Sequence, residues 1–439
     1  MSSNPPGFFF DPEAAGKRLP FGATADDFRW ATGIEDSFIP QTRPGLRALD
    51  EYELMGHYQH WRDDLLLARQ AGAQMIRWGI PWYRVEPQPG VFDWSWTDQV
   101  IPYIVDELGL EPILDLMHYG TPLWLDRSFV DPRYPTAVAA YAQAVAKRYG
   151  SRIRYYTPLN EPIVNALMCG MRGVWPPYLR GDRGFLAVGL ALAQGIVRTV
   201  RAIQSVDPSA VMVHVEAAGL TRSARAELEP LAVEQQRRGF LFYDLITGRV
   251  DSAHPLFGWL LNSGVSYTAL EWLKQHAIPI DVMGLNFYPQ WSTQQVDLNG
   301  RGTIRYRLVE RDGAGFSELI QSYYDRYHAP IMITETSAKL GQAIKQRWLD
   351  TSVAAVRELR RSGVPVIGYT WFPLFTMVDW RYRTGQRPLE EYFVELGLYE
   401  HGSADGDRYA ATPLVAQFRE FTRNPAAAVG DLLPEHVGV

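Results

Sequence analysis

The 439-residue chain contains a single cysteine, Cys169, which excludes an internal disulfide and a cluster of thiolate metal ligands. None of its nine histidines lies in a His-Glu-x-x-His motif, so a zinc site of that kind is not expected. No Gly-x-Gly-x-x-Gly turn follows an apolar run, which disfavours a dinucleotide-binding fold. The sequence therefore predicts neither a metal nor a cofactor.

Long apolar segments and an excess of positive charge are also missing. The longest apolar stretch, Phe185 to Ala193, is too short to cross a bilayer. The first residues, Met1 to Gly7, lack the basic start and apolar run of a secretory signal. A formal net charge of −6 argues against nucleic acid or an anionic membrane as the partner. We expect a cytoplasmic protein that acts on a small molecule.

Short apolar runs alternate with segments of helical periodicity along the chain. Eight runs rich in β-branched and aromatic residues are predicted to be strands: Phe28–Gly33, Met75–Trp82, Glu111–His118, Ile153–Glu161, Val211–Ala217, Asp281–Tyr288, Pro330–Thr336 and Val366–Phe372. Helical periodicity lies between them, over Tyr58–Ala71, Pro135–Tyr149, Phe185–Ser205, Tyr267–Gln275, Gly315–Tyr327 and Lys345–Ser362.

Strand alternating with helix predicts a parallel sheet, and eight such units are enough to close a (β/α)8, or TIM, barrel. We expect an α/β protein with one barrel domain over residues 1–439. Residues 1–25 and 424–439 are expected to be surface tails. Extended loops are expected after the sixth and eighth strands, at Trp291–Asp312 and Asp379–Glu395.

Polar side chains gather where the predicted strands end, and the most informative of them are two glutamates, Glu161 and Glu335. In a closed barrel these ends converge on one pocket, where polar side chains indicate catalysis. Two carboxylates facing each other there are the machinery that cleaves glycosidic bonds. Ion pairs in the core would explain single members of the set, but not all of them. The other members are Arg77, Asp115, His118, Asn160, His214, Glu216, Asn286, Tyr288, Trp371, Asp379 and Trp380.

With these motifs the chain resembles family 1 glycoside hydrolases, the β-glucosidase family of retaining (β/α)8 enzymes. The family carries Thr-Phe-Asn-Glu-Pro after strand four, and Thr157-Pro158-Leu159-Asn160-Glu161-Pro162 is similar to it with one residue inserted. The family's Ile-Thr-Glu-Asn-Gly is matched by Ile333-Thr334-Glu335-Thr336-Ser337. The resemblance implies that Glu161 is the general acid/base and Glu335 the nucleophile.

The resemblance also implies roles for the side chains around the two glutamates. Arg77 opens a run similar to Arg-x-Ser-x-x-Trp-x-Arg, whose first arginine lies beside the nucleophile. His118 and Tyr119 stand where the family has His-Trp, and that histidine binds the glycon. Asn286 and Tyr288 lie in a segment similar to Gly-Ile-Asn-Tyr-Tyr, so Tyr288 should hydrogen-bond the nucleophile.

The differences from the family pattern concern recognition of the glycon. The usual Gln-Ile-Glu-Gly is here Gly33-Ile34-Glu35-Asp36, so the glutamine that grips the sugar is missing. The segment that ends in Glu-Trp in the family ends here in Asp379-Trp380, and Trp371 or Phe372 is expected to be the platform under the sugar.

Together these features imply a retaining exo-β-glycosidase that binds a small-molecule glycoside and works by double displacement. Its two carboxyl groups should lie roughly 5–5.5 Å apart. A phospho-β-glycosidase is one alternative, because Arg381, Arg383 and Arg387 follow Asp379. A transglycosylase would use the same residues, and a carbohydrate-binding barrel without catalysis is an alternative of another class.

Overall fold

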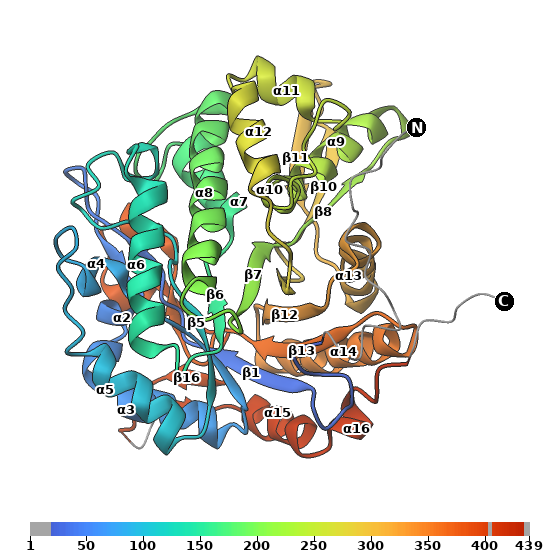
Figure 1. Ribbon diagram of the computed structural model, residues 1–439. Helices are drawn as coiled ribbons and strands as arrows, with labels where there is room; N and C mark the ends of the chain where they lie inside the picture. The colour runs from blue at the N-terminus through green and yellow to red at the C-terminus, as the bar shows by residue number, and fades with distance from the viewer. Residues whose placement is uncertain (1–18, 403–405, 434–439) are drawn as a thin grey trace.

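The computed structural model describes residues 19–402 and 406–433, and its centre is a closed barrel of eight parallel strands (Figure 1). The predicted fold class is confirmed. Around the barrel the order is β1 (Arg29–Gly33), β13 (Val366–Trp371), β12 (Ile331–Thr336), β9 (Val282–Asn286), β7 (Val211–Ala217), β6 (Tyr155–Thr157), β5 (Glu111–Asp115) and β4 (Met75–Gly79).

Several strands end earlier than the sequence predicts. The fourth predicted strand was expected to reach Glu161, but β6 stops at Thr157, next to Pro158, and β4 stops two residues before Pro81. Proline has no N–H to donate to a strand ladder, so pairing stops near these positions. The residues beyond each strand are therefore free to form the loops at the carboxyl end of the barrel.

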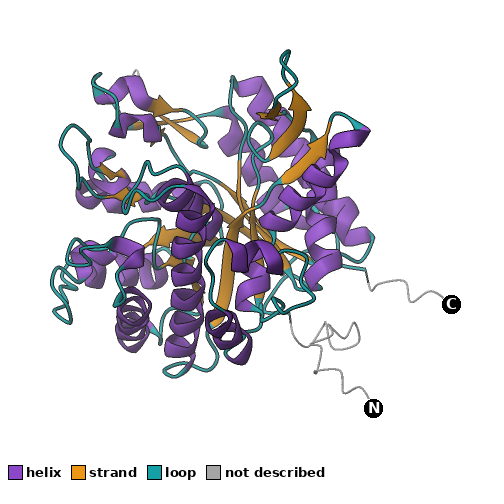
Figure 2. Cartoon of the chain, turned by 90° about the horizontal axis from the view of Figure 1, so that it is seen from above, coloured by secondary structure: helices purple, strands orange, loops and turns teal. Residues whose placement is uncertain are grey.

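Helices surround the barrel, as the view from above shows (Figure 2). The predicted ones appear as α3 (His57–Gln70), α6 (Tyr134–Tyr149), α8 (Gly181–Gln204), α12 (Tyr267–Gln275), α13 (Gly313–Tyr327) and α14 (Gln342–Arg361). Further helices are α2 (Glu51–Leu54), α4 (Trp82–Val85), α5 (Thr97–Pro102), α7 (Pro162–Asn165), α9 (Glu229–Gly239), α10 (Leu241–Ile246), α11 (Phe257–Asn262), α15 (Pro413–Arg423) and α16 (Pro425–Ala428). Two π-helical turns, η1 (Tyr103–Glu107) and η3 (Ala166–Met171), continue α5 and α7.

One of these helices, α8, is long and apolar enough to span a membrane by length and composition. In the fold it packs on α6 and η3, and 61% of its most apolar window is buried. Its hydrophobic residues therefore serve the core between the barrel and the outer helices.

The segments predicted as long loops contain short elements of their own. After β9, the strands β10 (Thr293–Leu298) and β11 (Ile304–Leu308) join β8 (Leu220–Ser223) in a three-stranded sheet beside α9. After β13, β14 (Met377–Val378) pairs with β15 (Phe393–Val394), and the turns η5 (Trp380–Arg383) and η6 (Leu389–Tyr392) lie between them. The remaining elements are η2 (Ser128–Val130), η4 (Ala226–Leu228), β2 (Phe38–Ile39), β3 (Leu49–Asp50), β16 (Tyr399–His401) and β17 (Tyr409–Ala411).

The described parts of the two expected surface tails are partly buried against the barrel. Phe21 is 2% exposed and packs edge-on against Tyr155, where it joins the apolar side chains inside the barrel. At the other end α16 leads to the fully buried Val429. Burial of these apolar groups stabilises both ends against the barrel. The rest of the two expected tails, residues 1–18 and 434–439, lies outside the described residues.

The side chain of Arg360 joins both ends of the chain to strand β13. It is fully buried, and its guanidinium donates hydrogen bonds to the carbonyl oxygens of Gly22 (2.8 Å), Val366 (2.6 Å) and Gly430 (3.0 Å). Removing these donors leaves buried carbonyls without partners, at a cost of about 1–3 kcal/mol each.

We therefore expect Arg360→Met to lower the free energy of unfolding by about 3 kcal/mol, measured by urea denaturation. The matched control is Arg361→Met, because the Arg361 side chain is 58% exposed and forms a surface ion pair with Glu358 (2.9 Å). That variant should change stability by less than about 0.5 kcal/mol. Equal effects of the two substitutions would contradict the role given to Arg360.

Candidate active site

The two predicted glutamates line one cavity of about 800 Å³ at the carboxyl end of the barrel. Glu335 lies in β12 and pairs in register with Asn286 of β9. Glu161 stands between β6 and α7, and its N–H donates to the carbonyl of Val215 (3.1 Å). Its backbone is left-handed (φ 45°), a conformation that costs roughly 1–3 kcal/mol and is typically retained at functional sites.

Both oxygens of Glu335 have fixed partners. The Nη1 of Arg77 donates to Oε1 at 2.6 Å, and the hydroxyl of Tyr288 donates to Oε2 at 2.7 Å. Arg77 is 2% exposed, and its Nη2 donates to Asp115 at 2.8 Å. A buried guanidinium at this distance compensates negative charge on Glu335 inside the barrel.

Glu161 has neutral partners instead. The hydroxyl of Tyr119 donates to Oε2, and Nδ2 of Asn286 donates to Oε1 at 2.9 Å. Burial, followed by the charge of Glu335, raises the pKa of Glu161 from its ordinary 4.5 to about 7. A carboxyl group with this pKa can hold a proton at neutral pH and can also take one back.

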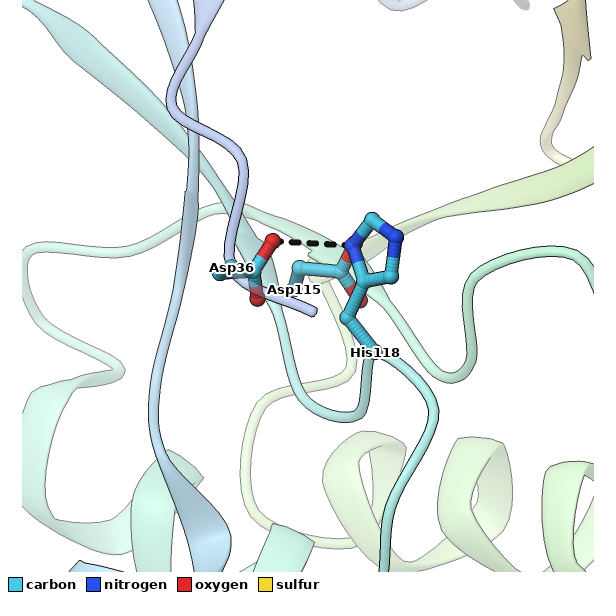
Figure 3. Close-up of side chains that lie close together, drawn as sticks. All are labelled: Asp36, Asp115 and His118. Atoms are coloured by element: carbon cyan, nitrogen blue, oxygen red, sulfur yellow. Dashed lines mark hydrogen bonds and ion pairs between the residues drawn. The ribbon is translucent and has the colours of Figure 1, made fainter. Parts of the chain in front are cut away.

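His118 lies among acids at the edge of the same cavity. Its Nδ1 is 2.8 Å from Asp36 and 3.7 Å from Asp115 (Figure 3). Its Nε2 is 3.6 Å from Glu35. Burial opposes a charge on the ring, but Asp36 and Glu35 outweigh it and raise the pKa of His118 to about 10. The Nδ2 of Asn160 lies 2.8 Å from the ring. Asn160 thereby connects His118 to the side chains that contact the two glutamates.

Asp36 is a site residue that the sequence analysis did not select. A Cβ placed on Gly79 would lie 1.6 Å from Oδ2 of Asp36, so the carboxylate occupies space that a side chain at position 79 would need. The family pattern has glycine where Asp36 stands and serine where Gly79 stands. The two differences therefore compensate each other. The side chain that is missing at position 79 leaves room for the carboxylate of Asp36, which contacts His118.

The acids Asp36 and Asp115 and the ring of His118 have ligand atoms that all lie within 4.8 Å of one another. Carboxylate and imidazole groups at this spacing form a donor set that a divalent cation could use. Arg77, at 2.8 Å from Asp115, already supplies positive charge there. His118 supplies positive charge as well, because its pKa is raised. We interpret the cluster as a network that orients His118.

Trp380, not Trp371, is the aromatic side chain from the strand-eight segment that lines the cavity. The expectation for Trp371 was wrong, because this residue is fully buried and its Nε1 donates to the carbonyl of Leu396 (3.0 Å). Phe372 is also buried, and a Cβ on Gly33 would meet its ring at 2.6 Å. Trp380 packs edge-on against Trp175 at 5.0 Å between ring centroids.

Of the predicted residues, Arg77 and Asn160 lie behind the cavity wall, where they hold the side chains in front of them. Glu35 lines the cavity, and the sequence analysis did not single it out as a site residue. The sequence feature that could have indicated Glu35 is its place in the segment that corresponds to Gln-Ile-Glu-Gly in the family. The predicted residues that line the cavity are Glu161, Glu335, His118, Tyr119, Asn286, Tyr288, Asp379 and Trp380.

The arginines that suggested a phosphate site are engaged elsewhere. Arg381 forms an ion pair with Asp379 at 2.7 Å, and Arg387 pairs with Glu391 at 2.9 Å. Arg383 is buried and donates to the carbonyl of Ile39 at 2.8 Å. A phosphate at this rim would have to compete with these partners and with the charge of Asp379.

Comparison with known proteins gives the family. Residues 20–242 match the model of glycosyl hydrolase family 1. The chain is 24% identical to beta-glucosidase 1B of Phanerodontia chrysosporium over 74% of this chain and 70% of that protein. It is 22% identical to the aryl-phospho-beta-D-glucosidase BglH of Bacillus subtilis over 72% of this chain and 76% of that protein.

Solved structures show the same fold. A family 1 β-glucosidase from Thermotoga maritima superposes with a TM-score of 0.77 at 17% identity, covering 91% of this chain and 98% of that one. The Thermotoga maritima β-glucosidase in complex with deoxynojirimycin also gives 0.77, at 18% identity and with 93% and 99% coverage. The chain belongs to glycosyl hydrolase family 1 and is a glycoside hydrolase.

Proposed function

We propose that the chain is a retaining exo-β-glycosidase of the β-glucosidase type, with Glu335 as nucleophile and Glu161 as general acid and base. One observation carries the proposal: two glutamates in one cavity have opposite environments. Glu335 faces the cation of Arg77, whereas burial raises the pKa of Glu161 to about 7. Unequal environments of this kind assign the two roles of a carboxyl pair.

In the first step a carboxylate oxygen of Glu335 attacks the anomeric carbon. The bond to the leaving oxygen breaks, its electron pair stays on that oxygen, and Glu161 supplies the proton. Tyr288 and Arg77 hold the attacking carboxylate in place, which limits the reorganisation needed at the moment of attack. The product of this step is a glycosyl ester of Glu335 and a free alcohol.

In the second step Glu161, now ionised, takes a proton from a water molecule. The water oxygen bonds to the anomeric carbon, and the ester bond breaks with its electrons returning to Glu335. Two displacements at one carbon restore the original configuration. Glycosides without a phosphate are the better fit, because Arg381 and Arg387 are already paired with acids.

The direct test is a trapping experiment. A 2-deoxy-2-fluoro-β-glucosyl fluoride should inactivate the enzyme in a time-dependent manner and leave the sugar on the peptide that contains Glu335, detected by mass spectrometry. A panel of chromogenic glucoside, galactoside, fucoside, mannoside, xyloside and 6-phosphoglucoside would identify the glycon. Activity on none of these, together with no trapped ester, would favour the carbohydrate-binding alternative.

Glu335→Ala should lower kcat by at least roughly 10⁴-fold, because the nucleophile of the first step is lost. Added azide should restore part of the turnover and give the α-glycosyl azide, since one displacement inverts the anomeric centre. Glu161→Ala is the matched variant, and azide should there give the β-glycosyl azide. The same azide anomer from both variants, read by NMR, would contradict the assignment of roles.

The fall of kcat/KM on the alkaline side should report the pKa of Glu161, near 7, because the first step needs its proton. The hydrogen bond from Tyr119 lowers that pKa, so Tyr119→Phe should raise it and move the alkaline limb to higher pH by about one unit.

The control for this prediction is Tyr156→Phe. Tyr156 is a buried barrel tyrosine whose hydroxyl donates to the carbonyl of Ile153 (3.2 Å), and its loss should leave the limb in place. A limb that stays put, or moves to lower pH, in Tyr119→Phe would show that Glu161 is not the titrating acid.

A further inference from the structure

The cavity continues past the two glutamates, on the side of the chain segment that follows Glu161. Its volume of about 800 Å³ lies in the upper part of the range for small-molecule sites, roughly 300–1,000 Å³. Polar groups surround the end where His118 and Glu35 lie. The continuation is lined instead by apolar side chains, namely Ile163, Val164, Leu167, Met171, Phe185 and Leu220.

Most of this wall comes from one apolar helical segment, Pro162–Met171, which combines α7 and η3 and begins one residue after Glu161. The half-buried Ile163, Val164, Leu167 and Met171 recur at helical spacing, so they share one face. The segment packs closely on α8, because a Cβ on Gly170 would lie 2.4 Å from the carbonyl oxygen of Gly184. The face with the four side chains remains open to the cavity.

Polar side chains also line the cavity farther out, namely Arg172, Thr221, Gln235, Arg238 and Gln294. Gln294 donates to the hydroxyl of Thr221 (3.0 Å), and Arg238 donates to Glu234 (2.6 Å). At the outer end Trp291 is 42% exposed and Leu308 is 60% exposed. Against the apolar face of Pro162–Met171 a sugar would lose hydration of its hydroxyls without gaining hydrogen bonds from these side chains, whereas a hydrocarbon would bury its surface favourably.

We propose that the natural substrate carries a large, mainly aliphatic aglycon, which occupies this apolar continuation, rather than a second sugar. The proposal rests on the β-glycosidase function above, in which Glu161 protonates the leaving oxygen. Because the apolar segment starts next to Glu161, a chain attached to that oxygen extends along Ile163, Leu167 and Met171. The apolar side chains of Pro162–Met171 thereby favour amphiphilic glycosides as substrates.

The test measures kcat/KM for straight-chain alkyl β-D-glucosides from ethyl to octyl. The acidity of these alcohols hardly changes along the series, so differences report contacts with the chain. We expect kcat/KM to rise about threefold for each added methylene until the cavity is filled. β-D-Glucosyl fluoride is the reference substrate, because its leaving group occupies almost none of the continuation, and cellobiose represents a sugar as leaving group.

The double variant Leu167→Ala, Met171→Ala should lower the ratio of kcat/KM for octyl glucoside to that for the fluoride about tenfold. This ratio does not depend on the fraction of correctly folded enzyme. The matched control is Val174→Ala, an apolar side chain that is 43% exposed just beyond the segment and does not line the cavity. It should leave the ratio unchanged.

A rate independent of chain length, or a higher kcat/KM for cellobiose than for octyl glucoside, would overturn the aglycon proposal while fluoride hydrolysis still supports the glycosidase function. An unchanged ratio in the double variant would overturn it as well. If neither the fluoride nor any glycoside of the chromogenic panel is cleaved, the glycosidase function fails, and the aglycon proposal fails with it.

Discussion

The guanidinium of Arg77 holds together a group of acids that could not otherwise remain side by side inside a barrel. Glu335 and Asp115 each contact it directly, at 2.6 Å and 2.8 Å, and the three side chains are almost completely buried. Burial disfavours every one of these charges, so a single cation placed between two carboxylates makes the arrangement possible. Removing a partner from such a pair leaves an uncompensated buried charge, which makes Arg77 important for stability as well as for the position of Glu335. Glu335 is therefore part of a buried network that links β4, β5 and β12 across the barrel.

The division of labour between the glutamates follows from which neighbours each can reach. Arg77 reaches Glu335, whereas the partners of Glu161 are the hydroxyl of Tyr119 and the amide of Asn286. Asn286 stands beside Glu335 in register and donates to Glu161, so it spaces the two acids as well as orienting one of them. A neutral setting leaves burial as the main influence on Glu161 and places its pKa at about 7, where a proton can leave and return within one catalytic cycle.

The barrel and the two glutamates could be predicted from the sequence because both follow from local patterns. Alternating apolar runs and helices define the strands, and polar residues directly after a strand must lie at its carboxyl end. The orientation of Trp371 had no such signal, since both faces of β13 are buried and alternation gives no distinction between them. The exchange between Asp36 and Gly79 was also not predictable, because the segment after β1 and the end of β4 meet only in space. The packing of Phe21 and Val429 was not predicted either. It depends on Arg360, which is buried, whereas an arginine is expected at the surface from the sequence alone.

The apolar wall beside Glu161 also bears on how the second step chooses its acceptor. In the proposed mechanism water and an alcohol would use the same base, Glu161, so the acceptor held nearer to it would complete the turnover. Tyr119 and Asn286 direct their donors at the carboxyl group, while Ile163 and Leu167 offer no hydrogen bond that would order a water molecule on the aglycon side. An alcohol with an aliphatic chain gains burial there, which water cannot. In the proposed mechanism, the apolar wall that favours an aliphatic leaving group in the first step also favours the same alcohol as acceptor in the second, so transfer to that alcohol would compete with hydrolysis.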